Sequence, residues 1–141
     1  MEKVHTTNYF NTLIAVAEDC PASRGEMPPE RGAARSVATI QFELIYDHPY
    51  RFTSDDVVFE VHAVRNGLSG DSLKTERGIF FAKGQPCLRC SPLAKRYGWG
   101  IHSDEQGRVA LYGMETPEYR AFLRDKKLQV VKAMRSKKAG R

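Results

Sequence analysis

The sequence contains few cysteines and no long apolar run, and each of these features excludes a class of protein. Three cysteines among 141 residues are too few for a disulfide framework, and the odd number argues against a secreted, disulfide-stapled scaffold. The longest apolar run, residues 13–17, is far shorter than the roughly 20 residues that span a bilayer, so we expect no membrane segment. Residues 1–8 lack the apolar region of a signal peptide, and we therefore expect a cytoplasmic protein.

The motifs that mark common enzyme classes are also missing. The sequence has no GxSxG nucleophile turn, no GxxxxGK[ST] phosphate-binding loop and no GxGxxG dinucleotide-binding turn. No residue pattern requires a cofactor, and we expect none. These absences favour a protein without enzymatic activity.

The length is typical of one domain, but the charge is unevenly distributed along it. Residues 120–141 carry a net charge of +8, whereas residues 1–119 carry −3. A basic segment beside a slightly acidic body is a plausible contact for phosphates or acidic surfaces. The sequence therefore predicts a single α+β domain over residues 1–123, followed by a basic helical extension or tail over residues 124–141.

Local patterns predict a small antiparallel sheet with helices packed on one of its faces. Residues 12–17 favour a strand, and residues 99–103 and 108–112 form the clearest hairpin, because Gly107 ends a good turn between them. Residues 20–35, rich in Pro and Gly, predict a long loop. Helices are expected after the hydroxyl caps Ser36, Thr53 and Thr116 and over residues 71–83.

Two segments also fit a second assignment. Residues 12–17 could belong to a helix, and residues 57–63 alternate as a strand would, although the Thr53 cap favours a helix there. The terminal helix is expected to bury apolar side chains as far as Val130 and Met134. In the hairpin, alternation directs one set of side chains to the core and leaves His102 on the other face, free to titrate.

The densest group of binding-type side chains lies between residues 89 and 102. Arginine offers a planar fork for carboxylate or phosphate, and aromatic rings offer flat contact area. The first hypothesis is therefore a non-enzymatic binding or accessory protein, with a small anionic ligand or a protein partner. The second is a small enzyme in which His102 acts as acid or base and the arginines hold an anionic substrate. The alternative is an ordinary surface, in which Trp99 belongs to the core, Arg96 pairs with an acid and His102 is solvated. The candidate residues are Arg89, Lys95, Arg96, Tyr97 and His102.

Cys87 and Cys90 form a CxxC pair. A turn brings two thiols at this spacing to one side, where they can bind a metal or form a redox disulfide. No second CxxC or HxxxH pair completes a zinc site, although Cys20 with His62 or His102 could do so. We therefore expect no metal site and keep the pair as an alternative.

The basic tail gives a third hypothesis, electrostatic binding of nucleic acid. No aromatic residue follows Phe122, so the tail lacks a platform for base stacking, and a solubilising terminus is the alternative. The residues that would contact phosphates are Lys126, Lys127, Lys132, Arg135, Lys137 and Lys138.

Four blocks of the sequence resemble a known family. They are HTTNYFNT at residues 5–12, TSDDV at 53–57, KGQPCLR at 83–89 and KRYGWGIH at 95–102. Together they are similar to a family of small, mostly bacterial proteins known as a domain of unknown function. The resemblance covers about residues 5–122 and implies a single intracellular domain with no catalytic residue to carry over. The family often has Ala or Ser at the position of Cys90, and the basic tail lies outside the resemblance.

Overall fold

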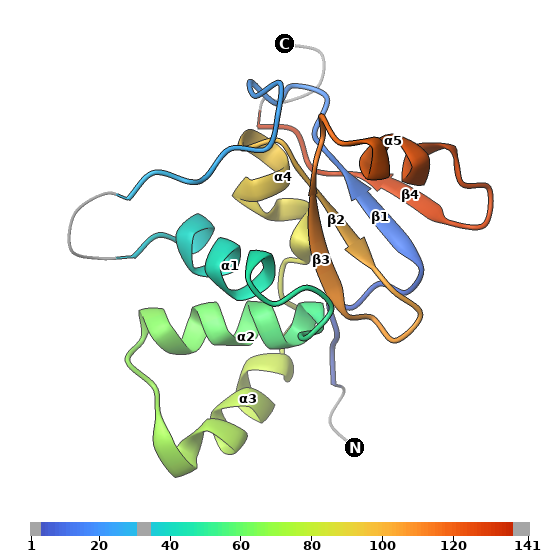
Figure 1. Cartoon of the computed structure of the whole chain (residues 1–141). Coiled ribbons are helices and arrows are strands. Elements are labelled where there is room, and N and C mark those ends of the chain that lie inside the picture. The colour runs from blue at the N-terminus through green and yellow to red at the C-terminus, as the bar shows by residue number, and fades with distance from the viewer. Residues whose placement is uncertain (1–3, 31–34, 137–141) are drawn as a thin grey trace.

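A computed structural model of the chain describes residues 4–30 and 35–136. Within these residues, the central element is a four-stranded sheet with the order β3-β2-β1-β4 (Figure 1). Neighbouring strands run antiparallel except β1 and β4, which are parallel. The α+β class is confirmed, and the sheet is mixed rather than purely antiparallel. The strands are β1 (Thr12–Ala15), β2 (Trp99–Ser103), β3 (Val109–Gly113) and β4 (Gln129–Lys132).

Four of the five α-helices in the described segments begin at hydroxyl caps. Ser36, Thr53 and Thr116 each accept a backbone N–H from the first helical turn, as the sequence predicts. Ser91 caps a short helix that the sequence analysis did not assign. No helix in residues 4–30 and 35–136 is long and apolar enough to cross a membrane. The α-helices are α1 (Val37–Tyr46), α2 (Ser54–Arg65), α3 (Leu73–Phe81), α4 (Pro92–Arg96) and α5 (Pro117–Arg124), with 3-10 turns η1 (Gly70–Ser72) and η2 (Leu88–Cys90).

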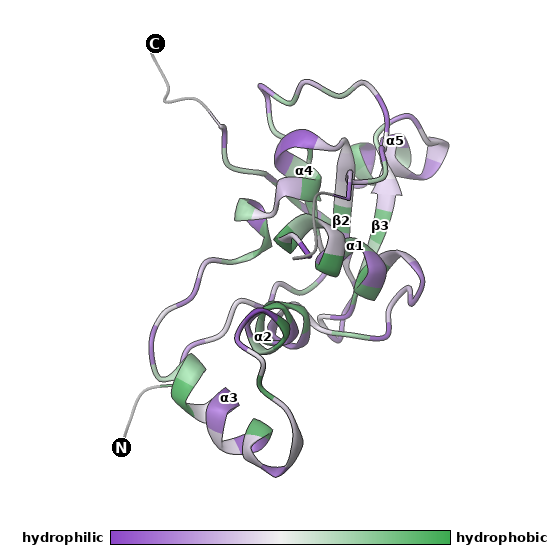
Figure 2. Ribbon diagram, turned by 90° about the vertical axis from the view of Figure 1, so that its left-hand side faces the viewer, coloured by the Kyte–Doolittle hydropathy of each residue, from purple (hydrophilic) through white to green (hydrophobic). Residues whose placement is uncertain are grey.

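Helices cover both faces of the sheet, whereas the sequence predicts them on one. α1, α2 and α4 pack against the face that carries Ile14, Ile101 and Val109. Figure 2 shows α2 nearly end-on, with α3 beside it. α5 packs on the opposite face, where the hydroxyl oxygen of Tyr119 accepts the N–H of Val16. The predicted alternation of the hairpin is confirmed, but the second face is covered by α5 rather than by solvent.

The segment after α5 is a strand, where the sequence analysis expected a longer helix. α5 ends at Arg124, and residues 129–132 pair with β1. Val130 lies opposite Leu13 in this register. Pairing satisfies the backbone groups on the edge of β1, and that gain overrides the helical pattern. Ala133, just beyond the strand, is buried in the core.

The first two of the four sequence blocks hold the N-terminal segment against α2. The carboxylate of Asp55 accepts hydrogen bonds from the Thr6 hydroxyl and from both the N–H and the hydroxyl of Thr7, at 2.6–2.7 Å. In return, the N–H of Asp55 donates to the side-chain oxygen of Asn8 at 2.9 Å. These contacts fix the start of the chain, and with it Tyr9, beside the first turn of α2.

The KRYGWGIH block holds the loop that precedes α1. The N–H of Glu26 donates to the carbonyl of Tyr97 at 2.8 Å, and the indole N–H of Trp99 donates to the carbonyl of Glu26 at 2.8 Å. Gly98 has a positive φ of 78° and lies directly against the backbone of Arg24. Residues 24–26 of the loop therefore lie close to the start of β2.

Candidate functional site

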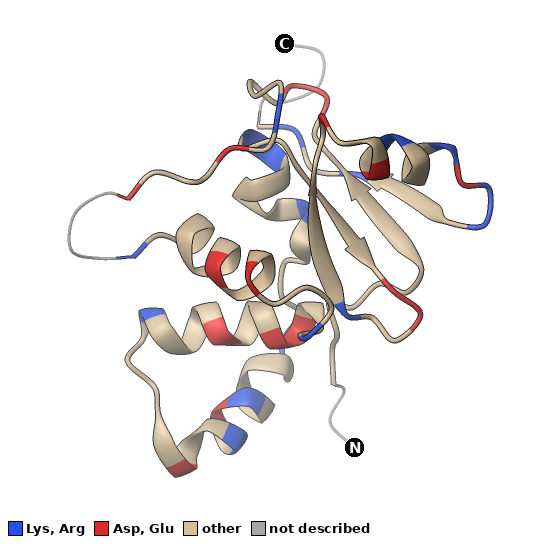
Figure 3. Cartoon of the chain, in the orientation of Figure 1, with Lys and Arg blue, Asp and Glu red and all other residues tan. Residues whose placement is uncertain are grey.

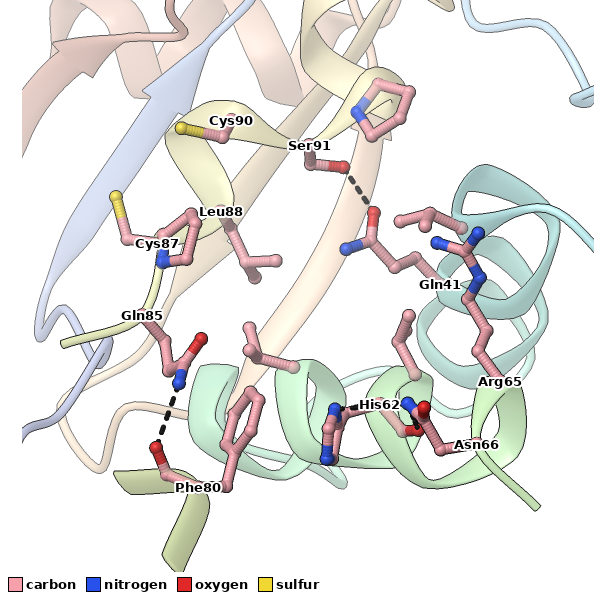
Figure 4. A pocket seen from close by; sticks show the side chains of 15 residues that line it. Gln41, His62, Arg65, Asn66, Phe80, Gln85, Cys87, Leu88, Cys90 and Ser91 are labelled. Atoms are coloured by element: carbon pink, nitrogen blue, oxygen red, sulfur yellow. Dashed lines mark hydrogen bonds between the residues drawn. The ribbon is translucent and has the colours of Figure 1, made fainter. Parts of the chain in front are cut away.

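A pocket of about 540 Å³ lies between α1, α2 and residues 85–92 (Figure 4). This volume falls within the range of roughly 300–1,000 Å³ that is usual for small-molecule sites. The walls are largely apolar, and polar groups stand at separate points around them. The apolar lining residues are Val37, Val58, Val61, Phe80, Pro86, Leu88 and Pro92.

Gln41 of α1 supplies a hydrogen-bond donor to this pocket. The hydroxyl of Ser91 donates to Oε1 of Gln41 at 2.5 Å, and both residues are buried. The amide nitrogen of Gln41 has no protein partner, yet no buried side-chain nitrogen or oxygen of the described residues lacks one. The nitrogen must therefore reach the open space, and Figure 4 shows it directed into the pocket.

The last turn of α2 brings three polar side chains to the same pocket. The amide nitrogen of Asn66 donates to the carbonyl of His62 at 2.8 Å and lies 3.3 Å from Nδ1 of the imidazole. An amide nitrogen can only donate, so the geometry assigns Nδ1 as acceptor and places the ring proton on Nε2. Phe80 packs against the imidazole, with ring centroids 4.5 Å apart. Arg65 completes the group and lies on the α1 side of the pocket (Figure 4).

Arg65 is the charged side chain of the pocket, and the fifteen lining residues include no aspartate or glutamate. No described residue forms a salt bridge with Arg65. A guanidinium without a carboxylate partner, next to an apolar wall, is a favourable contact for an anion. The arrangement therefore suits a small organic anion.

Sequence patterns did not reveal this group, and His62 was considered as a metal-binding partner of the CxxC pair. The signal was present in α2: Val58, Val61, His62, Arg65 and Asn66 follow the spacing that places residues on one helix face. Contacts across the pocket, such as Gln41 with Ser91, join segments fifty residues apart, and no local pattern marks them.

The structure places the predicted cluster between residues 89 and 102 on two sides of the sheet. Arg89 lies on η2 and donates through Nε to a β4 carbonyl at 2.7 Å. Lys95 and Arg96 form the last turn of α4, and Tyr97 follows it and packs against the core. His102 lies on the opposite face, against α5. Arg89 and His102 are therefore not neighbours in one site.

His102 forms a network with two tyrosines on the α5 face. The Tyr50 hydroxyl lies 2.8 Å from Nδ1 of His102 and 2.8 Å from the Tyr112 hydroxyl. Phe122 of α5 stacks on the imidazole, with centroids 4.3 Å apart and planes within 6°. Burial lowers the pKa of His102, and burial together with the Tyr112 hydroxyl raises the pKa of Tyr50 above its usual range.

This environment predicts that acid destabilises the protein through His102. Burial lowers the pKa of the folded state, opposed by the weaker effects of Asp104 and Asp125, so the unfolded chain binds the proton more readily. The contribution of His102 to the free energy of unfolding is therefore complete above about pH 6.5, the pKa of a histidine in the unfolded chain. It is lost as the pH falls below that value. Urea unfolding at pH 7.5 and 5.5 measures the change. Between these pH values, the wild type should lose more of its free energy of unfolding than His102→Gln does. Equal losses would contradict this assignment.

The basic residues of the C-terminal segment are partly paired. Nζ of Lys132 lies 2.7 Å from the Glu18 carboxylate, and Arg135 lies 3.9 Å from the same group. Lys126 and Lys127 are exposed in the loop between α5 and β4, where Figure 3 shows a group of basic residues. Residues 137 and 138, the two remaining lysines of the predicted nucleic-acid contact, lie outside the described residues.

All three cysteines are free. Within the described parts of the chain, no three or more His, Cys, Asp or Glu side chains are grouped so that they could hold a metal ion. Cys20 packs against the core clusters on both faces of the sheet, and His102 lies beneath α5. Of the three residues considered as metal-binding partners of the CxxC pair, His62 lines the same pocket as Cys87 and Cys90, but these side chains do not form a metal-binding group.

The fold and the pocket define an α+β domain with a pocket between α1, α2 and residues 85–92. A family model, the family of unknown function DUF6157, matches residues 4–139, and the chain belongs to that family. The match includes most of the basic segment, which the sequence resemblance placed outside the family. Searches of the curated proteins and of the solved structures found no match.

Proposed function

We propose that the protein is a binding domain that holds a small organic anion in the pocket between α1, α2 and residues 85–92. The observation that carries the proposal is the charge of the lining: Arg65 lines a pocket without a carboxylate. Residues 1–119 as a whole are slightly acidic, so the positive charge of this pocket is a local feature.

The lining also indicates the chemical class of the ligand. Arg65 and the amide nitrogen of Gln41 are donors suited to the oxygens of a carboxylate or phosphate. The apolar walls, including Phe80 and Leu88, suit a hydrocarbon or aromatic body. We therefore expect a molecule with one anionic end and one apolar end. The proposed role is thus the binding role that the sequence suggests, but the proposed site lies at α2 rather than at residues 89–102.

Calorimetric titration with benzoate and with benzamide tests the proposal, because the two probes have similar shapes and differ in charge. Benzoate should bind and benzamide should not. Arg65→Gln should weaken benzoate binding by about tenfold or more, since a charge-assisted hydrogen bond contributes about 1.5–3 kcal/mol. Phenyl phosphate in place of benzoate distinguishes a phosphate site from a carboxylate site.

Arg124→Gln is the matched control. Arg124 is also the last residue of a helix and is exposed, but it belongs to α5 and does not line the pocket. Its substitution removes the same charge and should leave benzoate affinity unchanged. Equal weakening by both substitutions would show that net charge, rather than this pocket, determines binding, and the proposal would be wrong.

A second candidate function is acid–base chemistry at His102, which the hydrogen bond to Tyr50 favours. A lowered pKa keeps the imidazole neutral near pH 7 and able to accept a proton. Arg89 does not share this site, so the substrate-holding role expected for it has no support from the geometry. The anion-binding proposal is preferred because its donors converge on one open space.

A further inference from the structure

Cys87 and Cys90 stand at the two ends of a single tight turn. The N–H of Cys90 donates to the carbonyl of Cys87 at 3.0 Å, which closes the turn around η2. Such a turn brings its end Cα atoms to within about 7 Å, close to the separation that a disulfide requires. Figure 4 shows both sulfur atoms directed to the same side of the segment. The turn therefore holds the two cysteines at a backbone spacing that a disulfide can span.

The two thiols differ in exposure, and one has a polar partner. Cys90 is exposed, whereas Cys87 is half-buried and its sulfur lies 3.4 Å from the hydroxyl of Tyr9. Arg89 lies close enough to Tyr9 to act electrostatically on that hydroxyl. Burial and the contact with Cys87 raise the pKa of Tyr9, so its hydroxyl stays protonated and can donate to a thiolate. A hydrogen bond from this hydroxyl would stabilise the thiolate form of Cys87.

We propose that Cys87 and Cys90 form a thiol–disulfide exchange site that reacts with low-molecular-weight disulfides. The inference goes beyond anion binding and does not depend on it. The thiolate of Cys90 attacks one sulfur of the disulfide, which gives a mixed disulfide and releases one thiolate. The thiolate of Cys87 then attacks the Cys90 sulfur, which forms the Cys87–Cys90 bond and releases the second thiolate. Two protons from the protein thiols convert the leaving groups to thiols, so the protein is oxidised and the small disulfide is reduced.

The roles of the two cysteines follow from their surroundings. The exposed Cys90 can be reached by a disulfide from solution, whereas Cys87 needs only to reach its neighbour across the turn. Tyr9 is a positioning residue that stabilises the Cys87 thiolate by a hydrogen bond. Its place is fixed in turn by the contacts of the preceding residues with Asp55.

Reaction of the reduced protein with oxidised glutathione, followed by intact-mass and peptide mass spectrometry, tests the inference. The wild type should lose two hydrogens, with the bond mapped to Cys87 and Cys90. Cys87→Ser should stop at the mixed disulfide on Cys90, and Cys90→Ser should block internal bond formation. Tyr9→Phe should slow the second step by about tenfold, the expected effect of losing a hydrogen bond to a charged group, and should accumulate the mixed disulfide.

Cys20→Ser is the control, because Cys20 packs against the core and should contribute nothing to the reaction. It should behave as the wild type does. If wild-type Cys90 reacts no faster than Cys20, or if the mixed disulfide persists in the wild type, the inference is wrong. Either failure leaves the benzoate titration unaffected, so the two proposals are tested separately.

Discussion

Gly98→Ala is expected to destabilise the protein by roughly 3–5 kcal/mol, because the substitution combines two penalties. The positive φ of 78° disfavours any residue with a Cβ. An added Cβ would also overlap the carbonyl oxygen of Arg24, a backbone atom that cannot rotate away. The loop would have to leave the start of β2, and the hydrogen bond from Glu26 to the carbonyl of Tyr97 would be lost. Urea unfolding measures the change directly.

Gly67→Ala separates the two penalties. Gly67 has a similar φ of 66°, but no atom lies within 4 Å of an added Cβ. Gly67→Ala should therefore lower the free energy of unfolding only by the penalty for a Cβ at positive φ, about 1–2 kcal/mol. A loss at Gly98 no greater than the loss at Gly67 would mean that the loop does not press against β2.

Asp55→Ala is expected to destabilise the protein by about 3 kcal/mol, because buried donors lose their acceptor. Thr7 is 4% exposed, so its N–H cannot turn to water when the carboxylate is removed. The substitution also removes a negative charge from the first turn of α2. Asp55→Asn keeps one acceptor oxygen and should lower the free energy of unfolding by less than Asp55→Ala does. Urea unfolding gives the free energies, and amide hydrogen exchange at Thr7 should accelerate.

Glu60→Ala controls for the loss of an acidic side chain from α2. Glu60 is exposed on the same helix and forms no salt bridge with a described residue. Its substitution should change stability by less than about 0.5 kcal/mol. A similarly small effect at Asp55 would contradict the view that this carboxylate fastens the N-terminal segment.

The elements with strong local signals could be predicted from the sequence. Thr53 forms the expected cap, and Asp56 completes a capping box by accepting the N–H of Thr53. Gly107 takes the positive φ that the hairpin turn requires. In both cases neighbouring residues determine the conformation, so a single sequence carries the information.

The elements that depend on distant partners could not be predicted in the same way. Val130 and Val131 are half of β4, yet their strand forms only because the edge of β1 is open to pairing. α5 likewise covers the face of His102 through stacking by Phe122, which is twenty residues away. The candidate pocket has the same origin, since Arg65 and Ser91 meet around it only after the chain folds.

An NMR titration of the ¹⁵N-labelled protein with benzoate tests the central claim most directly. Anion binding in the pocket predicts shifts for the amide groups of Gln41, Arg65, Asn66 and Ser91, which line it. Arg65→Gln should reduce those shifts at the same benzoate concentration, and Arg124→Gln should leave them intact. Shifts confined to residues 124–136, or to His102 and its tyrosine neighbours, would place the anion elsewhere and would contradict the account.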